Sequence, residues 1–360
     1  MKSHTILEQT HAFSRRQGFG VITTAVLAAL ALAGTLGSAA HAQALTDVKI
    51  SVDYALYGPN SPIYYAEASG LFREAGIKAQ VDSSSGSGDA VNRVASGAYD
   101  AAYADLSTLA EFWARNPNVA PKMVMVILDR SPQAIVSMKE KNIKKIGDLV
   151  GHVVGTGQSD GAARMFSPIL KINHVDESKL TRKIVNQKIR DAMLVRNDVD
   201  AVTGYDFAIM FNLKSLGKKI EDANVIYYSD NGFDFYANGL IVSRDLIAKK
   251  PDLVRKLTRA VAKAWVKSIS DPDAVIAALA KRDPLTKVPL ELERLKWVNE
   301  KDVVTAATRK GGLGFVDADK LNHGLKVVAE GFGLSKVPTM ADVYDGQFLP
   351  PLEDRRIPAK

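Results

Sequence analysis

The sequence has no cysteine among its 360 residues. This absence excludes disulfide bonds, thiolate metal sites, a cysteine nucleophile and a lipid attached to an N-terminal cysteine. Histidine is scarce, with six residues, and neither an H-E-x-x-H spacing nor a Gly-x-Ser-x-Gly elbow accompanies them. We therefore expect a protein without catalysis, without a bound metal and without a cofactor.

Concentrated charge is also missing. The formal net charge is +7, and the basic residues are scattered rather than gathered in one block. Nucleic-acid binding needs a clustered basic stripe, so no nucleic-acid partner is expected. The composition, 46% hydrophobic and 24% charged, is that of a globular protein, and the length allows two domains or lobes.

The N-terminus lacks an apolar run long enough for a membrane span of about 20 residues. A twin-arginine segment at 14–19 precedes the apolar run Ala25–Ala33 and the small-residue end Ala40-His41-Ala42. This order is typical of a secretory signal peptide, and the twin arginines resemble a bacterial twin-arginine export signal. Because Phe19 lies one residue later than in that pattern, the general secretory route stays open. We expect residues 1–42 to be cleaved and the mature protein to be periplasmic, with an uncleaved anchor as the alternative.

The stretch Ile50–Gly76 predicts a strand, a loop and a helix. Ile50–Tyr54 alternates apolar and polar residues, prolines and a glycine interrupt 57–62, and Ile63–Phe72 has helical spacing. In open α/β sheets, ligands bind outside the carboxyl ends of strands. The tyrosines of this junction are therefore candidate ligand contacts, although packing in the core is an equal alternative for each: Tyr57, Tyr64 and Tyr65.

The remaining pattern alternates short apolar strands with helices. Strands are expected at 77–83, 100–104, 123–128, 134–138, 153–156, 225–228 and 240–243. Helices are expected at 90–95 with Asp89 as N-cap, at 162–171, from 251 onward, from 272 after an Asp271 cap, at 290–308 and at 317–330. The glycines of 157–161 do not fit the dinucleotide fingerprint, so that loop predicts no nicotinamide or flavin site.

Two segments one hundred residues apart have similar sequences, 94–101 and 194–201. In each, a helix ends at Gly97 or Asn197, the residue types that tolerate a left-handed helix end, before a short strand. Two equivalent α/β lobes would explain this repeat. It places Asp105 and the pair Tyr205–Asp206 at equivalent strand ends, facing each other if the lobes do.

Five segments in order resemble the substrate-binding proteins of bacterial ABC importers, specifically the nitrate/sulfonate/taurine group, which shares its domain with thiamine-pyrimidine proteins. They are SPIYYAEASGLFREAGIKAQV, VASGAYDAAYADL, IGDLVGHVVGTGQSDG, LVRNDVDAV and NGLIVSRDLIAKKPDLVRKLTRAVAKAW. The resemblance covers about residues 48–285. It implies a two-lobed periplasmic-binding fold of type II that closes around a ligand, no catalysis, and delivery to a membrane permease and its ATPase by a monomer.

Mapped onto this chain, the resemblance puts lobe one at 45–133 and 236–360, and lobe two at 134–235. The crossovers near 131–133 and 235–238 would form the hinge, and the proline-containing tail 349–360 is expected to be poorly ordered. The implied pocket contains Tyr57, Tyr64, Tyr65, Ser84, Ser85, Gly86, Asp105, Gln158, Ser159, Asp160, Tyr205 and Asp206. The chain departs from the family at GYDFA, where a proline-containing segment is common, and at Tyr54 and Tyr57, where many members carry a tryptophan.

Aromatic rings and carboxylates (Asp105, Asp160, Asp206) dominate this implied pocket, whereas a nitrate or sulfonate site needs cations or helix N-termini. The hypothesis is therefore a flat nitrogen heterocycle or cationic amine, such as a pyrimidine precursor. A simple anion stays open, since Arg93, Arg130 or Arg164 could turn inward. A periplasmic sensor is a further alternative, and a thiamine-pyrimidine enzyme is disfavoured because its cysteine-rich motif is absent.

Overall fold

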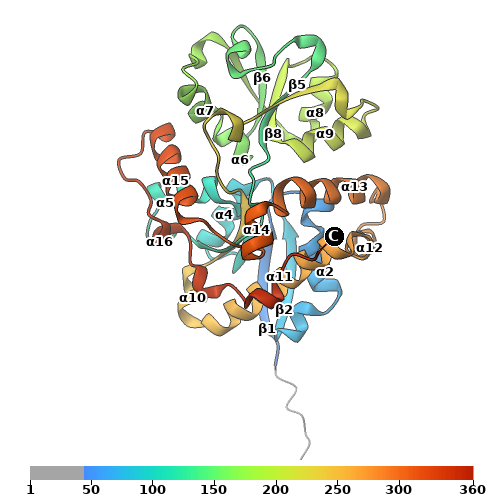
Figure 1. Ribbon diagram of the computed structural model, residues 1–360, viewed down its shortest axis with the longest axis vertical. Helices are drawn as coiled ribbons and strands as arrows, with labels where there is room; N and C mark the ends of the chain where they lie inside the picture. The colour runs from blue at the N-terminus through green and yellow to red at the C-terminus, as the bar shows by residue number, and fades with distance from the viewer. Residues whose placement is uncertain (1–43, 360) are drawn as a thin grey trace, which may run out of the picture. The chain divides into compact units, whose positions relative to one another are not determined.

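Two mixed five-stranded sheets form the core of the computed structural model, which describes residues 44–359 (Figure 1). The first sheet has the order β2-β1-β3-β10-β4 and contains β1 (Thr46–Val52), β2 (Ile77–Ser83), β3 (Ala101–Asp105), β4 (Lys122–Val126) and β10 (Asn238–Val242). The second has the order β7-β6-β8-β5-β9 and contains β5 (Gln133–Met138), β6 (Val153–Gly157), β7 (Thr181–Val185), β8 (Ala201–Tyr205) and β9 (Ala223–Tyr227).

The two sheets share one topology. In each, three strands pair in parallel, and one strand, β10 or β5, lies antiparallel between two neighbours. We call each sheet with its flanking helices a lobe, the first built on β1–β4 and β10 and the second on β5–β9. The predicted α/β, two-lobed fold is thereby confirmed.

Helices flank both sheets, mostly in the first lobe (Figure 1). The first lobe has α2 (Ser61–Ala68), α3 (Leu71–Glu74), α4 (Ser87–Ala95), α5 (Leu106–Arg115), α10 (Arg244–Lys249), α11 (Pro251–Ser270), α12 (Pro272–Arg282), α13 (Val288–Val298), α14 (Ala306–Gly311), α15 (Ala318–Phe332) and α16 (Met340–Val343). The second has α6 (Gly161–Arg164), α7 (Phe166–Ile172), α8 (Gln187–Val195) and α9 (Asp206–Ser215). A π-helical turn spans Asn299–Val303, and 3-10 turns span Gly58–Asn60, Lys139–Lys141, Ile146–Leu149, Glu177–Lys179, Ile220–Asp222, Ser229–Asn231, Gly346–Phe348 and Leu352–Asp354.

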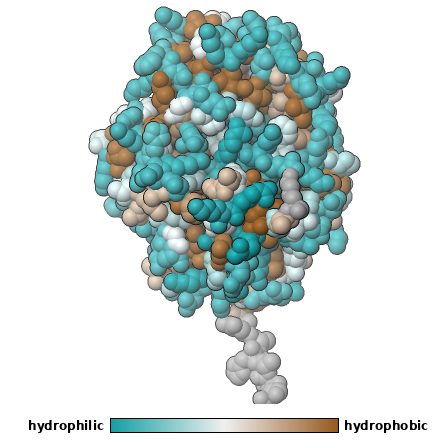
Figure 2. Space-filling model, in the orientation of Figure 1, coloured by the Kyte–Doolittle hydropathy of each residue, from teal (hydrophilic) through white to brown (hydrophobic). Residues whose placement is uncertain are grey.

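The residue pattern explains the layers. Every residue of β3 is buried, because its small side chains (AAYAD) allow helices to cover both faces. The apolar stripe of α11 packs on α2 and α12, and its Trp265 is fully buried against Tyr103 of β3. Truncation of such a buried tryptophan to alanine costs about 3–5 kcal/mol of stability. On the face shown in Figure 2, hydrophilic side chains cover most of the surface and hydrophobic ones form small groups.

Several local expectations are corrected. Asp89 is not a helix cap. Helix α4 begins at Ser87, three residues before the predicted start at 90, and its N-cap is Gly86. The Asp89 carboxylate accepts the Ser85 N–H instead. The segment 290–308 is not one helix, because the π-helical turn separates α13 from α14. The sequence predicts the end of α8 at Asn197 but not its start, and it does not predict the helices α5 and α9.

The C-terminal tail is ordered, contrary to expectation. The Arg355 guanidinium donates to the carbonyl oxygens of Gly311, Leu313 and Pro350, and the Ile357 side chain is only 7% exposed. These contacts outweigh the tendency of a proline-containing terminus to stay free.

The predicted helix ends at Gly97 and Asn197 are confirmed, since their φ angles are 78° and 63°. The signal peptide assigned to residues 1–42 lies outside the described residues. Among residues 44–359, no helix combines the length and the apolar composition needed to span a membrane.

Candidate functional site

The two lobes meet where the chain crosses between the sheets. The crossover from β4 to β5 and the one from β9 to β10 lie side by side, because the N–H groups of Ile127 and Leu128 both donate to the Asn238 carbonyl at 2.9 Å. Each crossover also accepts a hydrogen bond from the first residue of a helix. The Leu106 N–H donates to the Ala237 carbonyl, and the Asp206 N–H donates to the Pro132 carbonyl. The start of α5 and the start of α9 are thus fixed to the crossovers.

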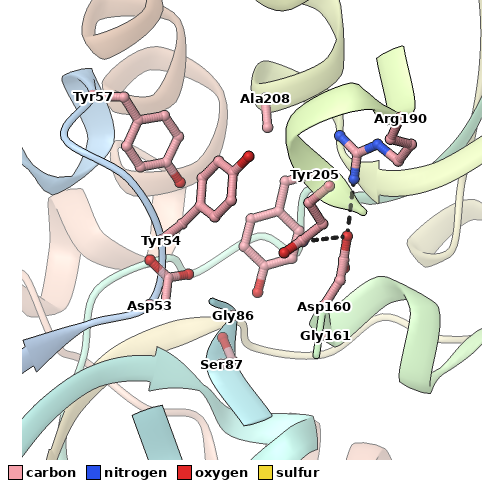
Figure 3. Close-up of a pocket in the computed structure, with 11 residues that line it drawn as sticks. Asp53, Tyr54, Tyr57, Gly86, Ser87, Asp160, Gly161, Arg190, Tyr205 and Ala208 are labelled. Carbon is pink, nitrogen blue, oxygen red and sulfur yellow. Dashed lines mark hydrogen bonds and ion pairs between the residues drawn. The ribbon is translucent and has the colours of Figure 1, made fainter. Parts of the chain in front are cut away.

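A cavity of about 30 Å³ lies between the lobes at these strand ends. Figure 3 shows its tyrosine rings, its carboxylates and an arginine directed toward a common space. The residues that line it are Asp53, Tyr54, Tyr57, Gly86, Ser87, Asp160, Gly161, Gln187, Arg190, Tyr205 and Ala208. A volume of this size holds about one or two water molecules, so the lobes are closed on one another.

A larger groove of about 870 Å³ adjoins the cavity, and Tyr54 and Gln187 line both. Among the twelve residues expected at the ligand, four line the cavity: Tyr57, Gly86, Asp160 and Tyr205. Another four line the groove: Ser84, Ser85, Gln158 and Ser159. The remaining four, Tyr64, Tyr65, Asp105 and Asp206, line neither.

Asp105 lies fully buried beside the cavity and joins the lobes. Its carboxylate accepts bonds from Thr108 N–H (2.9 Å) and the Ser107 hydroxyl within its own lobe. It also accepts bonds from two residues of the second lobe, from Gln133 Nε2 (3.0 Å) and from the Tyr205 hydroxyl (3.1 Å). We call this boundary between the two lobes the seam. Four protein donors therefore occupy the two oxygens of Asp105, so the carboxylate stabilises the closed arrangement.

Asp206 follows Tyr205 but is directed elsewhere. Its carboxylate accepts bonds from the Tyr227 hydroxyl (2.8 Å) and from Trp297 Nε1 (3.1 Å). Burial raises the pKa of Asp206. Tyr205 precedes the helix α9 and Asp206 is its first residue, so the two side chains diverge.

Tyr64 and Tyr65 pack within the first lobe. Tyr64 is buried under the Arg282 guanidinium, which lies 4.7 Å from its ring centroid. Tyr65 is half-buried against the hydrophobic core. For these two tyrosines the structure shows the packing alternative.

Asp53 is the cavity residue with the most unusual environment. It directly follows β1, is 4% exposed, and accepts one bond from Asn238 Nδ2 at 2.6 Å. Its other oxygen, Oδ1, has no partner among the described residues. Burial raises the pKa of Asp53 to about 7. The position after a strand was a usable signal, but the sequence reading included this residue in the strand.

Arg190 of α8 supplies the positive charge in the cavity lining. Its guanidinium contacts Asp160 (3.0 Å), Asp191 (2.8 Å) and the Thr203 carbonyl (3.0 Å). Asp160 also caps α6 by accepting the Ala162 N–H. Two carboxylates thus already balance the arginine charge. The sequence predictions did not include Arg190, although they placed the end of its helix at Asn197.

A chain of buried polar contacts extends from Arg190 back to the first lobe. Asp191 accepts a bond from Asn212 Nδ2 (2.7 Å), and Asn212 Oδ1 accepts one from Arg294 of α13 (3.1 Å). The Arg294 guanidinium also lies 5.4 Å from the Tyr57 ring centroid. Helix α13 therefore contacts both a cavity tyrosine and the second lobe.

Direct contacts close the lobes at the edge of the cavity. Gly88 N–H donates to the Ser159 carbonyl at 3.1 Å, and Gly86 lies so close that a Cβ there would be 2.4 Å from that oxygen. Arg164 of α6 pairs with Glu111 of α5. Within residues 44–359, no group of three or more histidine or acidic side chains is arranged to hold a metal.

Residues 59–275 match the family model described as NMT1/THI5 like, which is more than half of the chain. The chain belongs to the NMT1/THI5-like family. The expected resemblance is therefore confirmed. Among curated proteins, the chain is 25% identical over 331 residues to a riboflavin-binding protein, RibY, of Chloroflexus aurantiacus, covering 89% of this chain and 91% of the relative.

Solved structures of proteins with low sequence identity to this chain have the same fold. The periplasmic aliphatic sulphonate-binding protein SsuA of Escherichia coli matches with a TM-score of 0.63 and 15% identity, covering 82% of this chain and 96% of that one. The periplasmic nitrate-binding protein NrtA of Synechocystis matches with a TM-score of 0.58 and 12% identity, covering 84% and 87%. These likenesses show the periplasmic-binding-protein fold.

Proposed function

We propose that this protein is the periplasmic solute-binding component of an ABC importer. It captures a small aromatic or nitrogen-heterocyclic solute between its lobes and delivers it, without chemical change, to a permease and its ATPase. Family membership and the two-lobed fold support this role, as do the names of the structural neighbours, a sulphonate-binding and a nitrate-binding periplasmic protein.

The observation that carries the choice of ligand is the unpartnered Oδ1 atom of Asp53 in a cavity walled by tyrosines. A buried carboxyl oxygen without a partner costs free energy, which a ligand N–H would recover. Tyr54, Tyr57 and Tyr205 offer faces and edges for a flat ring.

The charges of the lining argue against a simple anion. Arg190 is paired with Asp160 and Asp191, and Asp53 adds a further acidic group. An incoming nitrate or sulfonate would have to displace a carboxylate from the arginine. A neutral ring with N–H donors meets no such competition.

Riboflavin is the first compound to test. Its flat heterocycle carries an imide N–H, and the relative RibY is named as a riboflavin-binding protein. The loop 157–161 lacks the dinucleotide fingerprint, but riboflavin has no phosphate that would require one. A pyrimidine precursor is the smaller alternative with the same donor chemistry. The cavity of about 30 Å³ is too small for either ring, so entry requires the lobes to separate.

The test is a titration of the mature protein with riboflavin, hydroxymethylpyrimidine, taurine and nitrate, followed by calorimetry and, for riboflavin, by its fluorescence. We expect binding of a heterocycle and a loss of at least about tenfold in Asp53→Asn, which is about 1.4 kcal/mol. Asp252→Asn, at an exposed position in the first turn of α11 and outside the cavity lining, is the control. Tight binding of taurine or nitrate with no response to either ring would overturn the ligand assignment.

A further inference from the structure

The groove beside the cavity has the size of a small-molecule site, whereas the cavity does not. The groove measures about 870 Å³ and the cavity about 30 Å³. Pockets for organic ligands usually enclose about 300–1,000 Å³. Most of the volume of any ligand that reaches Asp53 must therefore lie in the groove or displace the side chains between the two spaces.

Tyr54 and Gln187 line both the cavity and the groove. The Gln187 amide donates to Asp160, whereas the Tyr54 hydroxyl has no hydrogen-bond partner in the described part of the chain. The Tyr54 ring contacts Tyr57 edge-to-face with centroids 5.6 Å apart, and otherwise it is half-buried. A ring held against Tyr54 would have one edge at Asp53 and the opposite edge in the groove.

The groove walls carry neutral polar groups that the protein itself does not use. The side chains of Ser83, Gln158 and Ser159 have no hydrogen-bond partner among residues 44–359. By contrast, the charged pair Asp89–Arg93 is satisfied internally at 3.0 Å. Hydroxyl and amide groups both donate and accept, so they match the alternating donors and acceptors of a polyol.

Residues of both lobes line the groove, so a polyol chain of a ligand that lies in it would contact both lobes. Ser83 ends β2 in the first lobe, while Gln158 and Ser159 follow β6 in the second. On the second lobe, Ile184 of the edge strand β7 is 70% exposed at this groove and offers an apolar contact to the carbon side of such a chain. Contacts from both lobes would favour the closed state.

We propose that this groove is the second half of the ligand site and binds a flexible hydroxylated chain attached to the ring. The inference rests on the proposed function, because the ring must occupy the junction at Tyr54 for the chain to reach the groove. It narrows the ligand class from heterocycles in general to heterocycles that bear a polyol or sugar-like substituent.

The experiment compares ligands with the same ring and different chains. Riboflavin, lumiflavin (the same ring with a methyl group in place of the ribityl chain), ribitol and flavin mononucleotide are titrated against the mature protein by calorimetry. We expect riboflavin to bind at least about tenfold more tightly than lumiflavin, which corresponds to two or more hydrogen bonds. We expect no measurable binding of ribitol alone.

Variants then assign the difference to the groove. Ser83→Ala combined with Gln158→Ala should weaken riboflavin binding about tenfold and leave lumiflavin binding unchanged, so that lumiflavin affinity reports an intact ring site. Lys183→Ala, on β7 but outside the groove lining, is the matched control and should change neither.

Three outcomes overturn the inference in distinguishable ways. Equal affinities for riboflavin and lumiflavin would remove the chain subsite while leaving the proposed function intact. Binding of neither, with a response to taurine or nitrate instead, would remove the proposed ligand class and the subsite together. Much tighter binding of flavin mononucleotide would show that Lys188, which also lines the groove, selects a phosphate rather than hydroxyls.

Discussion

The segments 87–115 and 187–215 fold alike, element for element, at an offset of one hundred residues. Helix α4 corresponds to α8, strand β3 to β8 and helix α5 to α9, with identical lengths in each pair. Their backbone contacts repeat as well: Asp100 bonds to Lys49 of β1 as Asp200 bonds to Val153 of β6. The scaffold of the two lobes is thus the same, and the differences lie in single side chains at the seam.

Those differences make the seam complementary. Where the first lobe has Asp105 at the end of β3, the second has Tyr205 at the end of β8, and the two side chains hydrogen-bond at 3.1 Å. Where the first lobe has Ala90, the second has Arg190, which contributes its guanidinium to the cavity. An identical pair of lobes would place two carboxylates or two tyrosines opposite each other.

The largest expected effect comes from the starts of the equivalent helices α4 and α8. Gly86 precedes α4 with φ of 142° and lies against the Ser159 carbonyl, whereas the equivalent Asn186 caps α8 by accepting the Lys188 N–H. Gly86→Ala places a methyl group 2.4 Å from that oxygen, so the lobes cannot close as they do here. We expect ligand affinity to fall by at least about a thousandfold, about 4 kcal/mol.

Calorimetry with the bound solute and small-angle scattering with and without it measure this effect. Gly70→Ala is the control, because Gly70 has φ of 89° but no atom within 4 Å of the added Cβ. It should lose stability from backbone strain and keep its affinity. Compaction of Gly86→Ala on ligand addition to the same extent as the parent would contradict the role of this contact.

The second comparison concerns the ends of β1 and β6. Ile50 pairs with Ala101 as Val154 pairs with Ala201, which makes Asp53 the equivalent of Gly157. Only the first lobe therefore places a carboxyl group here, and burial raises its pKa from 3.8 to about 7. The folded state retains this proton up to about pH 7, while the unfolded state releases it near pH 4. Stability should consequently fall as the pH rises from about 4 to 7, by up to about 4 kcal/mol.

Urea denaturation of the ligand-free protein between pH 4 and pH 8 tests this dependence. Asp53→Asn keeps the shape and removes the titration, so its stability should be flatter over that window than that of the parent. The difference between the two proteins separates Asp53 from other buried carboxyls, such as Asp206, that act in the same direction. Parallel curves would contradict the assignment.

Features of the fold and of the site that depend on residues close together in the sequence could be predicted, and those that depend on residues far apart could not. The strand Ile77–Ser83 and the left-handed ends at Gly97 and Asn197 follow from local patterns and agree with the structure. Asp53 and Arg190 were missed, because their orientation depends on how two lobes meet. The polar sequence of α8 (QKIRDAMLV) gives no clear helical pattern, so only the end of the helix at Asn197 was predicted and its arginine had no expected position.

The hydrogen bond between Asp105 and Tyr205 allows a third test of whether the two lobes are complementary at the seam. Asp105→Ala removes the α5 cap and the bonds from Gln133 and Tyr205, which keep only Ser107 and Asn238 as acceptors, and should cost about 3 kcal/mol of stability. Tyr205→Phe removes the hydroxyl that contacts Asp105 and Asn238 and should cost about 1 kcal/mol. In a double-mutant cycle by urea denaturation, the two changes should couple by about 1 kcal/mol. Additive costs would show that this contact between lobes contributes nothing.

The smallest effect separates the two aspartates that are most alike. Asp100 and Asp200 each accept a backbone N–H of the neighbouring strand, at 2.8 and 2.9 Å, and loss of this bond should contribute about 1 kcal/mol to the cost of either alanine variant at pH 7. Asp200 also contacts Lys141 (2.8 Å) and His152 (3.4 Å), and although burial acts in the opposite direction, the Lys141 and Val153 bonds lower its pKa.

A lowered pKa means that the contribution of Asp200 is complete above pH 4 and is lost as the pH falls through the folded-state value. The cost of Asp200→Ala should therefore exceed that of Asp100→Ala at pH 7 and decrease on acidification to pH 3, as measured by urea denaturation at both pH values. Equal costs for the two variants at pH 7 would mean that Lys141 and His152 add nothing. The equivalence of the lobes would then extend from the backbone to these side chains.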